Sequence, residues 1–94
     1  MNGFEIGMLA VSKAGHDMDH LYVIMDMDSE YIYLVDGRIR TLDYPKKKKK
    51  KHVQIIHWKD VNLIDKIMNK TLINEDVKRV LKLYKRNDRD VYEV

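Results

Sequence analysis

Five stretches of the first 57 residues have the character of short β-strands. They alternate apolar with polar side chains, or they are rich in β-branched and aromatic residues. The stretches are residues 4–11, 21–28, 30–35, 38–42 and 53–57. Gly7 interrupts the first and is expected to mark a bulge or a close backbone approach. Short strands with hairpin-length connections predict a small antiparallel barrel or a rolled sheet.

The turns between these stretches fix the expected connections. The dipeptide Asp36-Gly37 favours a tight hairpin, because both residue types tolerate positive φ. Residues 38–42 are therefore expected to return antiparallel to residues 30–35. Pro45 cannot donate to a sheet ladder and is expected to end this strand. Residues 45–52 are then predicted to form a loop before the last strand.

Beyond Trp58 the apolar residues recur every three or four positions, which is typical of amphipathic helices. A short helix is predicted by Val61, Ile64, Ile67 and Met68. Asn74 is expected to cap a second helix. The apolar stripe of that helix consists of Val77, Val80, Leu81 and Tyr84. We expect the stripe to pack on the strands or on the preceding helix, with docking on another protein or another copy as the alternative. Residues 87–94 are predicted to form a tail.

The composition narrows the classes of function. The chain has 94 residues and no cysteine, which excludes a disulfide scaffold, a thiolate zinc site and a cysteine nucleophile. No serine lies in a nucleophile elbow and no glycine-rich phosphate loop is present, so we expect no enzyme activity, no cofactor and no small-molecule substrate. No apolar run approaches the roughly 18 residues of a membrane span, and the first residues lack a signal-peptide pattern. We expect a cytoplasmic protein that does not bind membranes.

Charge is distributed unevenly along the chain. Residues 1–37 carry one lysine and seven carboxylates, a net charge of −6, whereas residues 38–94 carry 17 basic groups and 8 carboxylates, a net charge of +9. The two parts are expected to attract each other in the fold or to face different partners. Within the basic part, the lysines of the run Lys46 to Lys51 repel one another unless an anion neutralises them. The run makes nucleic acid the first partner to consider, and a solvated loop is the alternative.

Three sequence blocks resemble a known family. Residues 7–17, Gly-Met-Leu-Ala-Val-Ser-Lys-Ala-Gly-His-Asp, followed by Tyr22-Val23-Ile24, resemble the KOW motif of large-subunit ribosomal proteins and NusG-type transcription factors. The blocks 35–40 (Val-Asp-Gly-Arg-Ile-Arg) and 45–52 (proline, the lysine run and histidine) follow in order. Together they are similar to small bacterial KOW-domain RNA-binding proteins related to L14e-type ribosomal proteins. The resemblance covers about residues 4–57 and implies an SH3-like barrel that binds RNA at the ribosome.

The expected architecture is thus mainly β with C-terminal α. A small SH3-like antiparallel β-barrel is predicted over residues 1–57, with its lysine-rich loop at 45–52. One or two helices and a short tail are predicted over residues 58–94.

The KOW-like loop departs from the family pattern. Family members place a basic residue and then Asp-Lys-Gly after the loop glycine, where this chain has His16-Asp17-Met18-Asp19-His20. Lys13 and a protonated His16 are the cations that remain, so the expected RNA contacts shift toward the lysine run. The same string contains four residues of metal-ligand types, but on a turn we expect a polar loop rather than a metal site.

The predicted RNA-binding residues are basic and share no catalytic chemistry. They are Lys13, Arg38, Arg40, Lys46, Lys47, Lys48, Lys49, Lys50, Lys51 and His52. Arginine binds phosphate with a planar fork, so Arg38 and Arg40 on one strand face are expected to position RNA, with a surface pair near carboxylates as the alternative. Basic residues of the second helix are expected to add phosphate contacts. Aromatic stacking on bases is the alternative for three tyrosines that we expect in the core or at its rim, Tyr22, Tyr31 and Tyr33.

The predicted function is non-catalytic binding of ribosomal or other structured RNA, mainly through phosphate contacts and shape. The alternative is a KOW-type protein–protein module whose acidic part binds a basic partner, such as a ribosomal protein or a polymerase subunit. A third hypothesis, a metal-dependent accessory domain, depends only on the histidine–aspartate string.

Overall fold

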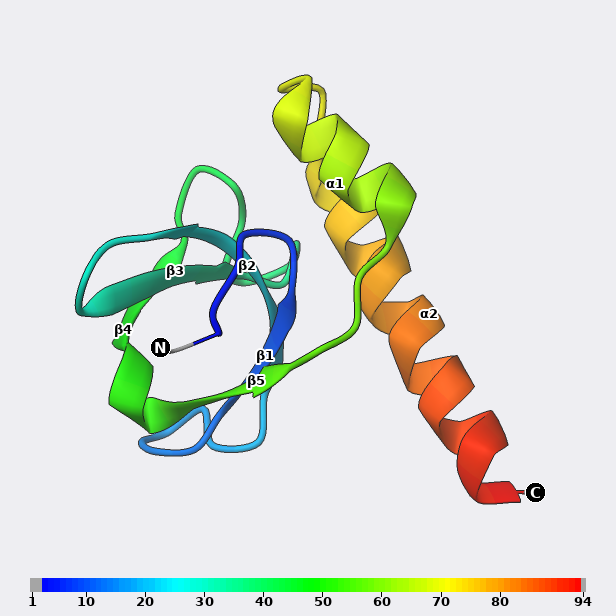
Figure 1. The fold of residues 1–94 in the computed structure, drawn as a ribbon, viewed down its shortest axis with the longest axis horizontal. Helices are drawn as coiled ribbons and strands as arrows, with labels where there is room; N and C mark the ends of the chain where they lie inside the picture. The colour runs from blue at the N-terminus through cyan, green and yellow to red at the C-terminus, as the bar shows by residue number, and fades with distance from the viewer. Residues whose placement is uncertain (1–2, 94) are drawn as a thin grey trace.

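A computed structural model describes the backbone of residues 3–93 and the side chains of residues 3–86. Within this range an antiparallel five-stranded sheet precedes two α-helices (Figure 1). The strands are β1 (Leu9–Ser12), β2 (Leu21–Met27), β3 (Tyr31–Val35), β4 (Lys46–Lys49) and β5 (Val53–Ile56). The helices are the short 3-10 helix η1 (Lys50–His52) and the α-helices α1 (Val61–Met68) and α2 (Asn74–Glu93). The predicted class, mainly β with C-terminal α, is confirmed.

The sheet is strongly coiled. Its strand order is β4-β3-β2-β1-β5, which places β4 and β5 at opposite edges. In a flat sheet those edges would lie about 19 Å apart, because neighbouring strands are separated by about 4.8 Å. Yet β4 and β5 are joined by η1 alone, whose three residues rise about 6 Å. The sheet must therefore curl until its edges approach each other, as Figure 1 shows, and this curling is compatible with an SH3-like barrel.

The fourth strand does not lie where the sequence pattern predicts it. Residues 38–42 form bends and a turn, and the strand that pairs with β3 is the lysine run itself. The prediction of a loop at 45–52 is therefore wrong, because four of the lysines are in β4 and the next two open η1.

The cause lies in the Asp36 side chain. Its Oδ1 accepts hydrogen bonds from the backbone N–H groups of Arg38 and Arg40, both at 2.9 Å, and the Asp36 N–H donates to the carbonyl oxygen of Arg40 at 2.8 Å. These bonds close residues 36–40 into a compact loop in place of a two-residue hairpin. Strand pairing with β3 resumes only after Pro45.

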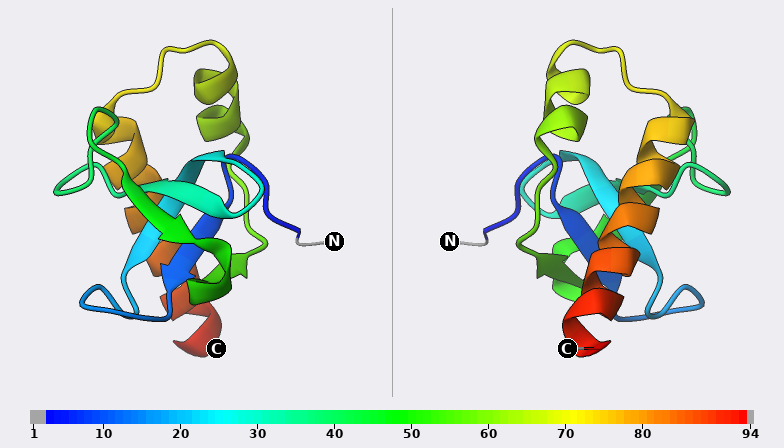
Figure 2. Two further views of the ribbon diagram at one scale, coloured as in Figure 1. Left: turned by 90° about the vertical axis from the view of Figure 1, so that its left-hand side faces the viewer. Right: turned by 90° about the vertical axis from the view of Figure 1, so that its right-hand side faces the viewer.

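Each face of the coiled sheet carries a buried core. The inner face holds a core of Met8, Ala10, Tyr22, Ile24, Ile32 and Leu34. The outer face carries a second core that the helices complete, formed by Leu9, Leu21, Val23, Val35, Leu63, Val77, Val80 and Leu81. Figure 1 shows α1 and α2 together on one side of the sheet, and the right-hand view of Figure 2 shows α2 crossing in front of the strands. Fully burying a side chain of this size contributes about 1.5–3 kcal/mol, so the helices belong to the folded unit. The prediction that the helical stripe packs within the chain is confirmed.

The start of β1 and the ends of the helices refine the predicted elements. The first strand begins at Leu9 rather than at residue 4, because Gly7 adopts a φ of +94°. A Cβ at Gly7 would lie 2.9 Å from Cγ1 of Ile64, so the expected close approach is made to α1. Asn74 is the first residue of α2 rather than its cap, and its side chain accepts a hydrogen bond from the Leu42 N–H at 2.9 Å. Helix α2 continues to Glu93, through the segment predicted to be a tail.

Over the described chain, neither helix combines the length and apolar character needed to cross a membrane.

Candidate nucleic-acid interface

Because β4 pairs with β3 along its whole length, its lysines lie alternately on the two faces of the sheet. The opposed pairs are Lys46 with Leu34, Lys47 with Tyr33, Lys48 with Ile32 and Lys49 with Tyr31. Directly opposed residues of an antiparallel pair have side chains on the same face. Leu34 and Ile32 are fully buried on the inner face, so Lys46 and Lys48 share that face. The other two lysines of β4 project from the outer face.

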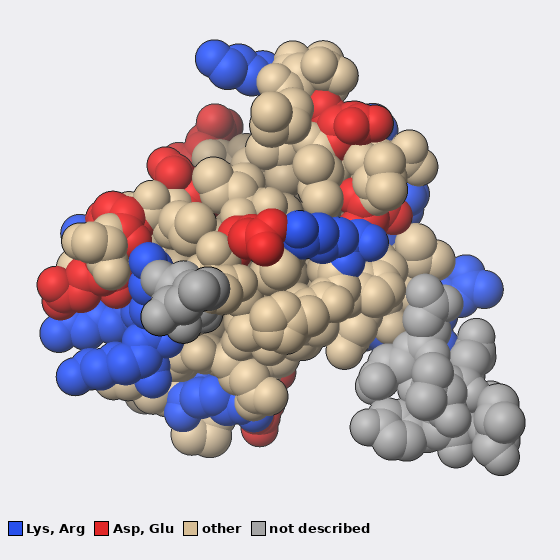
Figure 3. Space-filling view, viewed as in Figure 1, with Lys and Arg blue, Asp and Glu red and all other residues tan. Residues whose placement is uncertain are grey.

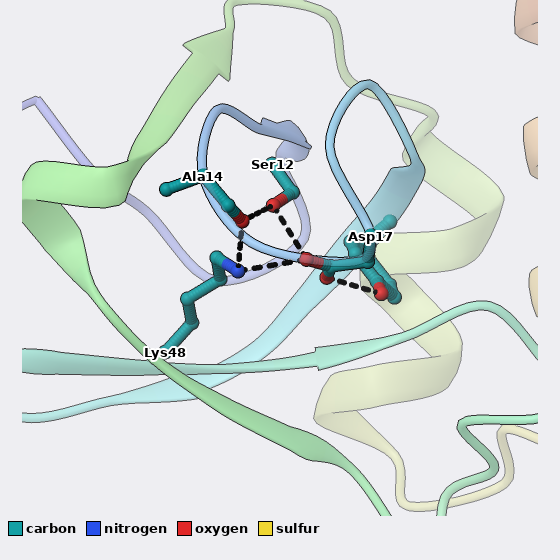
Figure 4. A network of polar contacts seen from close by, with 5 residues as sticks. Ser12, Ala14, Asp17 and Lys48 are labelled. Atoms are coloured by element: carbon teal, nitrogen blue, oxygen red, sulfur yellow. Dashed lines mark hydrogen bonds and ion pairs between the residues drawn. The ribbon is translucent and has the colours of Figure 1, made fainter.

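Lys48 forms an ion pair within the molecule. Its side chain is 11% exposed, and its Nζ lies 2.8 Å from Oδ1 of Asp17 and donates to the carbonyl oxygen of Ala14 at 2.7 Å (Figure 4). The Tyr22 hydroxyl donates to the other oxygen of Asp17 at 2.7 Å, and the Ser12 hydroxyl lies 2.9 Å from Oδ1. This set of contacts, the Asp17 network, ties the β1–β2 loop to the edge strand β4.

The contacts of the Asp17 network shift the pKa values of Asp17 and Tyr22. Burial alone would raise the pKa of the Asp17 carboxyl, but hydrogen bonds from Lys48, Tyr22 and Ser12 outweigh it and hold that pKa far below its ordinary value of 3.8. Burial and the contact with Asp17 raise the pKa of the Tyr22 phenol well above its ordinary value of 10.0. Asp17 is therefore fully ionised at neutral pH and neutralises Lys48. For this reason we do not expect Lys48 to contact RNA.

The remaining lysines of the run form a surface that we call the lysine edge. Its members are Lys46, Lys47, Lys49, Lys50 and Lys51. Figure 3 shows Lys and Arg side chains gathered on the side of the molecule where β4 and η1 lie in Figure 1. Among the side chains that the structure describes, Glu30 is the one carboxylate in an ion pair with the lysine edge, at 4.0 Å from Lys49. The lysine edge therefore carries a large excess of positive charge.

Aromatic and acidic neighbours hold Lys47 on the outer face. Its Nζ lies 4.4 Å from the ring centroid of Tyr31, a cation–π contact. Hydrogen bonds from the backbone N–H groups of Tyr31 and Glu30 lower the pKa of Asp28, and Lys47 contributes to this lowering. Lys47 thus keeps its position along the sheet while its ammonium group stays exposed.

Lys13 and His52 lie together at the end of the lysine edge. The Lys13 N–H donates to the carbonyl oxygen of His52 at 2.8 Å, which brings the β1–β2 loop beside η1. The Nζ of Lys13 lies 3.4 Å from Oδ1 of Asp19, with side chains 47% and 76% exposed. An exposed ion pair of this kind contributes little, so Lys13 is able to exchange its carboxylate for a phosphate.

A second basic surface lies between α2 and the start of β2. This groove of about 820 Å³, the helix groove, is lined among others by His20, Asp36, Arg38, Lys78, Lys82 and Lys85. The three lysines are spaced four and three residues apart and so lie on one face of α2. The carboxylate of Asp36 already accepts two backbone N–H groups and lies 2.8 Å from Nε2 of His20. The structure therefore places Arg38 with the cations of α2, apart from the lysine edge.

Arg40 does not join Arg38. The two arginines are expected on one strand face, but no strand forms at residues 38–42. The guanidinium of Arg40 instead lies 4.6 Å from the ring centroid of Tyr44.

Ion pairs join the acidic first part of the chain to the basic second part. Among the described side chains, three of the seven carboxylates of the first part are involved, in the pairs Glu5 with Lys59, Asp17 with Lys48, and Glu30 with Lys49. The expectation that opposite charges attract each other within the fold is confirmed. Fewer carboxylates are therefore available to a basic partner.

The tyrosines and the histidine–aspartate string separate in the structure. Tyr22 is buried, which removes it from base stacking, whereas Tyr31 and Tyr33 are half-buried on the outer face. Asp17 and Asp19 bind different lysines. Within residues 3–86, no three His, Cys, Asp or Glu side chains converge as metal ligands.

Sequence reasoning missed the helix groove and the pairing of Lys48 with Asp17. The spacing of the lysines on α2 is visible as a basic helix face, but nothing local indicates that Asp36 and Arg38 lie opposite it. The pairing of Lys48 with Asp17 spans 31 residues and has no local signature.

No family model matches the chain, and no curated protein matches it.

Proposed function

We propose that the chain is a non-catalytic, cytoplasmic RNA-binding protein that holds ribosomal or other structured RNA by its phosphates. The observation that carries the proposal is the lysine edge, whose five lysines form a single ion pair among the described side chains, between Lys49 and Glu30 at 4.0 Å. Such a surface binds polyanions. Each lysine that neutralises a phosphate releases a counterion that was condensed on the nucleic acid, and this release favours binding.

The secondary structure favours binding over simple solvation of the lysines. Lys47 and Lys49 lie on the outer face of β4, two residues apart. The Cα atoms of residues two apart in a strand are separated by about 7 Å. A flexible loop would lose backbone entropy on binding, whereas β4 and η1 have lost it already on folding. The lysine edge is thus a preorganised row of cations.

The resemblance of blocks 7–17, 35–40 and 45–52 to KOW-domain RNA-binding proteins supports the same partner. In this chain the KOW-like loop contributes Lys13, which lies beside His52 at the end of the lysine edge. The same loop lines the helix groove through His20. It therefore contributes to both basic surfaces, and an RNA strand that follows the loop would contact both of them.

The test of this proposal is the salt dependence of RNA affinity. The double variant Lys47→Gln/Lys51→Gln removes two exposed ammonium groups of the lysine edge. Each lost phosphate contact is expected to reduce the slope of log affinity against log salt by about 0.7–0.9, so the variant should lose about 1.5 of the slope. Titration of a structured RNA at several salt concentrations measures it.

The matched control is Lys59→Gln/Lys66→Gln, which removes the same charge. These two lysines are already paired, with Glu5 and Asp76 respectively. The control should keep the wild-type slope. Failure of the wild type to bind at low salt would overturn the proposed function, and an equal slope in both variants would overturn the assignment to the lysine edge.

A further inference from the structure

An apolar cleft opens on the outer face of the sheet, next to the lysine edge. It has a volume of about 400 Å³, and its apolar walls include Met25, Tyr33, Val35, Leu42, Ile67 and Leu72. Pockets of this size with mainly apolar walls are typical of sites for small organic groups. Nothing in the sequence pattern predicts the cleft, because its walls come from β2, β3, the loop before β4, α1 and the turn after it.

Local irregularities in the backbone shape this cleft. The register of β2 against β3 shifts between Ile24 and Asp26, a bulge that turns Met25 and Asp26 toward the opening. On the opposite side, Lys70 follows α1 with a φ of +60°, a common way for a helix to end. The cleft therefore combines apolar walls with one carboxylate and one ammonium group.

The cleft shares its walls with the lysine edge. Tyr33 lines the cleft and is directly opposed to Lys47 in the pairing of β3 with β4. Pro45 also lines the cleft and immediately precedes Lys46. A ligand held on the lysine edge by an anionic group is thus close enough to insert a neighbouring flat, apolar group into the cleft.

A nucleotide has both parts, and we propose that this cleft receives one unpaired base of the RNA whose phosphates lie on the lysine edge. The inference rests on the proposed function. The base lies against the ring of Tyr33 and the aliphatic walls, where stacking and burial stabilise it. Asp26 accepts, and Lys70 donates, hydrogen bonds at the base edge. The protein then recognises RNA through an unstacked base as well as through phosphates.

The test compares two single strands of equal length, one with bases and one composed of abasic residues. Both carry the same phosphates, so the lysine edge binds them equally. Because stacking of a base contributes about 1–3 kcal/mol, the wild type should bind the strand with bases roughly 10-fold to 100-fold more tightly. The variant Leu72→Trp, which fills the cleft without changing its charge, should bind both strands with the affinity that the wild type has for the abasic strand.

The control variant is Ile73→Trp, which adds the same bulk one residue further on, where the side chain is 55% exposed. It should keep the wild-type preference for bases, and thermal melting of both variants reports on their folding. Binding of both strands by the wild type with equal affinity would overturn the base site while leaving the phosphate-binding function intact, and would point to another occupant, such as an apolar protein side chain. A preference for bases that survives in Leu72→Trp would likewise overturn it. Failure to bind either strand would instead refute the proposed function.

Discussion

Replacing Asp17 by asparagine is expected to lower the free energy of unfolding by about 3 kcal/mol, and the melting temperature by about 15 °C. The substitution leaves the ammonium group of Lys48, which has an 11% exposed side chain, without its counter-charge. The substitution also replaces one carboxylate oxygen of Asp17 by an amide N–H₂ group, which cannot accept a hydrogen bond. Either the bond from the Tyr22 hydroxyl or the bond from the Lys48 ammonium group is therefore lost. Chemical denaturation of both proteins at pH 7 measures the loss.

The pH dependence of stability gives a second readout of the same contact. The pKa of Asp17 is lower in the folded protein than its ordinary value of 3.8, so its contribution is fully present above that pH. It is lost as the pH falls through the lower pKa of the folded state. The difference in stability between wild type and Asp17→Asn should therefore narrow below about pH 4.

Asp19 provides the matched control in the same loop. Its ion pair with Lys13 is exposed, and asparagine tolerates the φ of +70° that Asp19 adopts. Asp19→Asn should cost less than about 0.5 kcal/mol. Equal stabilities for the two variants would show that the Asp17 network does not anchor β4.

Replacing Gly37 by alanine is expected to destabilise the protein by about 3 kcal/mol, for two separable reasons. Its φ of +81° costs an alanine about 1 kcal/mol. The added Cβ would also lie 2.5 Å from the carbonyl oxygen of Asn74 and 2.8 Å from Cγ of Lys78. A backbone oxygen in the first turn of α2 cannot move away without shifting the helix from the sheet.

Gly15→Ala separates the two costs. Gly15 has a similar φ of +86°, but the nearest atom to its added Cβ is Nζ of Lys48, at 3.6 Å. Only the backbone strain should appear, about 1 kcal/mol. Thermal and chemical denaturation of both variants should therefore differ by about 2 kcal/mol, and equal losses would contradict the close packing of the Gly37 turn on α2.

The sequence predicts the parts of the fold that are rich in apolar residues. The apolar and β-branched stretch from Leu21 to Met27 marks β2 correctly, with its first four residues buried, and the spacing of Val77, Val80 and Leu81 marks the buried face of α2. The lysine run gives no such signal, because identical residues have no period. The lysine run forms a strand because it pairs with β3, and this pairing depends on contacts between residues that are distant in the sequence.

The Asp36-Gly37 dipeptide is misleading for a related reason. Its residue types suit a hairpin, yet the Asp36 carboxylate is 6% exposed and binds the backbone of the residues that follow. The loop that results contacts α2 through Gly37 and Leu42. Local propensity could not reveal this outcome, since it depends on a helix that begins more than 30 residues later.

The positive charge of the candidate RNA-contact surface can be predicted from the sequence. The positions of its side chains in the fold cannot. Lys48 forms an ion pair with Asp17, and Arg38 lines the helix groove rather than lying beside Arg40. The acidic β1–β2 loop then has a structural role, because the carboxylate of Asp17 neutralises Lys48, whose side chain is 11% exposed.

The chemical shifts of backbone amides map the proposed RNA-contact surface residue by residue. The protein, labelled with nitrogen-15, is titrated at low salt with a structured RNA. If the proposed function is correct, the largest shifts occur in residues 46, 47 and 49–52, at Lys13 and along the helix groove, and they fade as salt is raised. Shifts confined to other surfaces, such as the exposed face of α1, or no shifts at low salt, would contradict it.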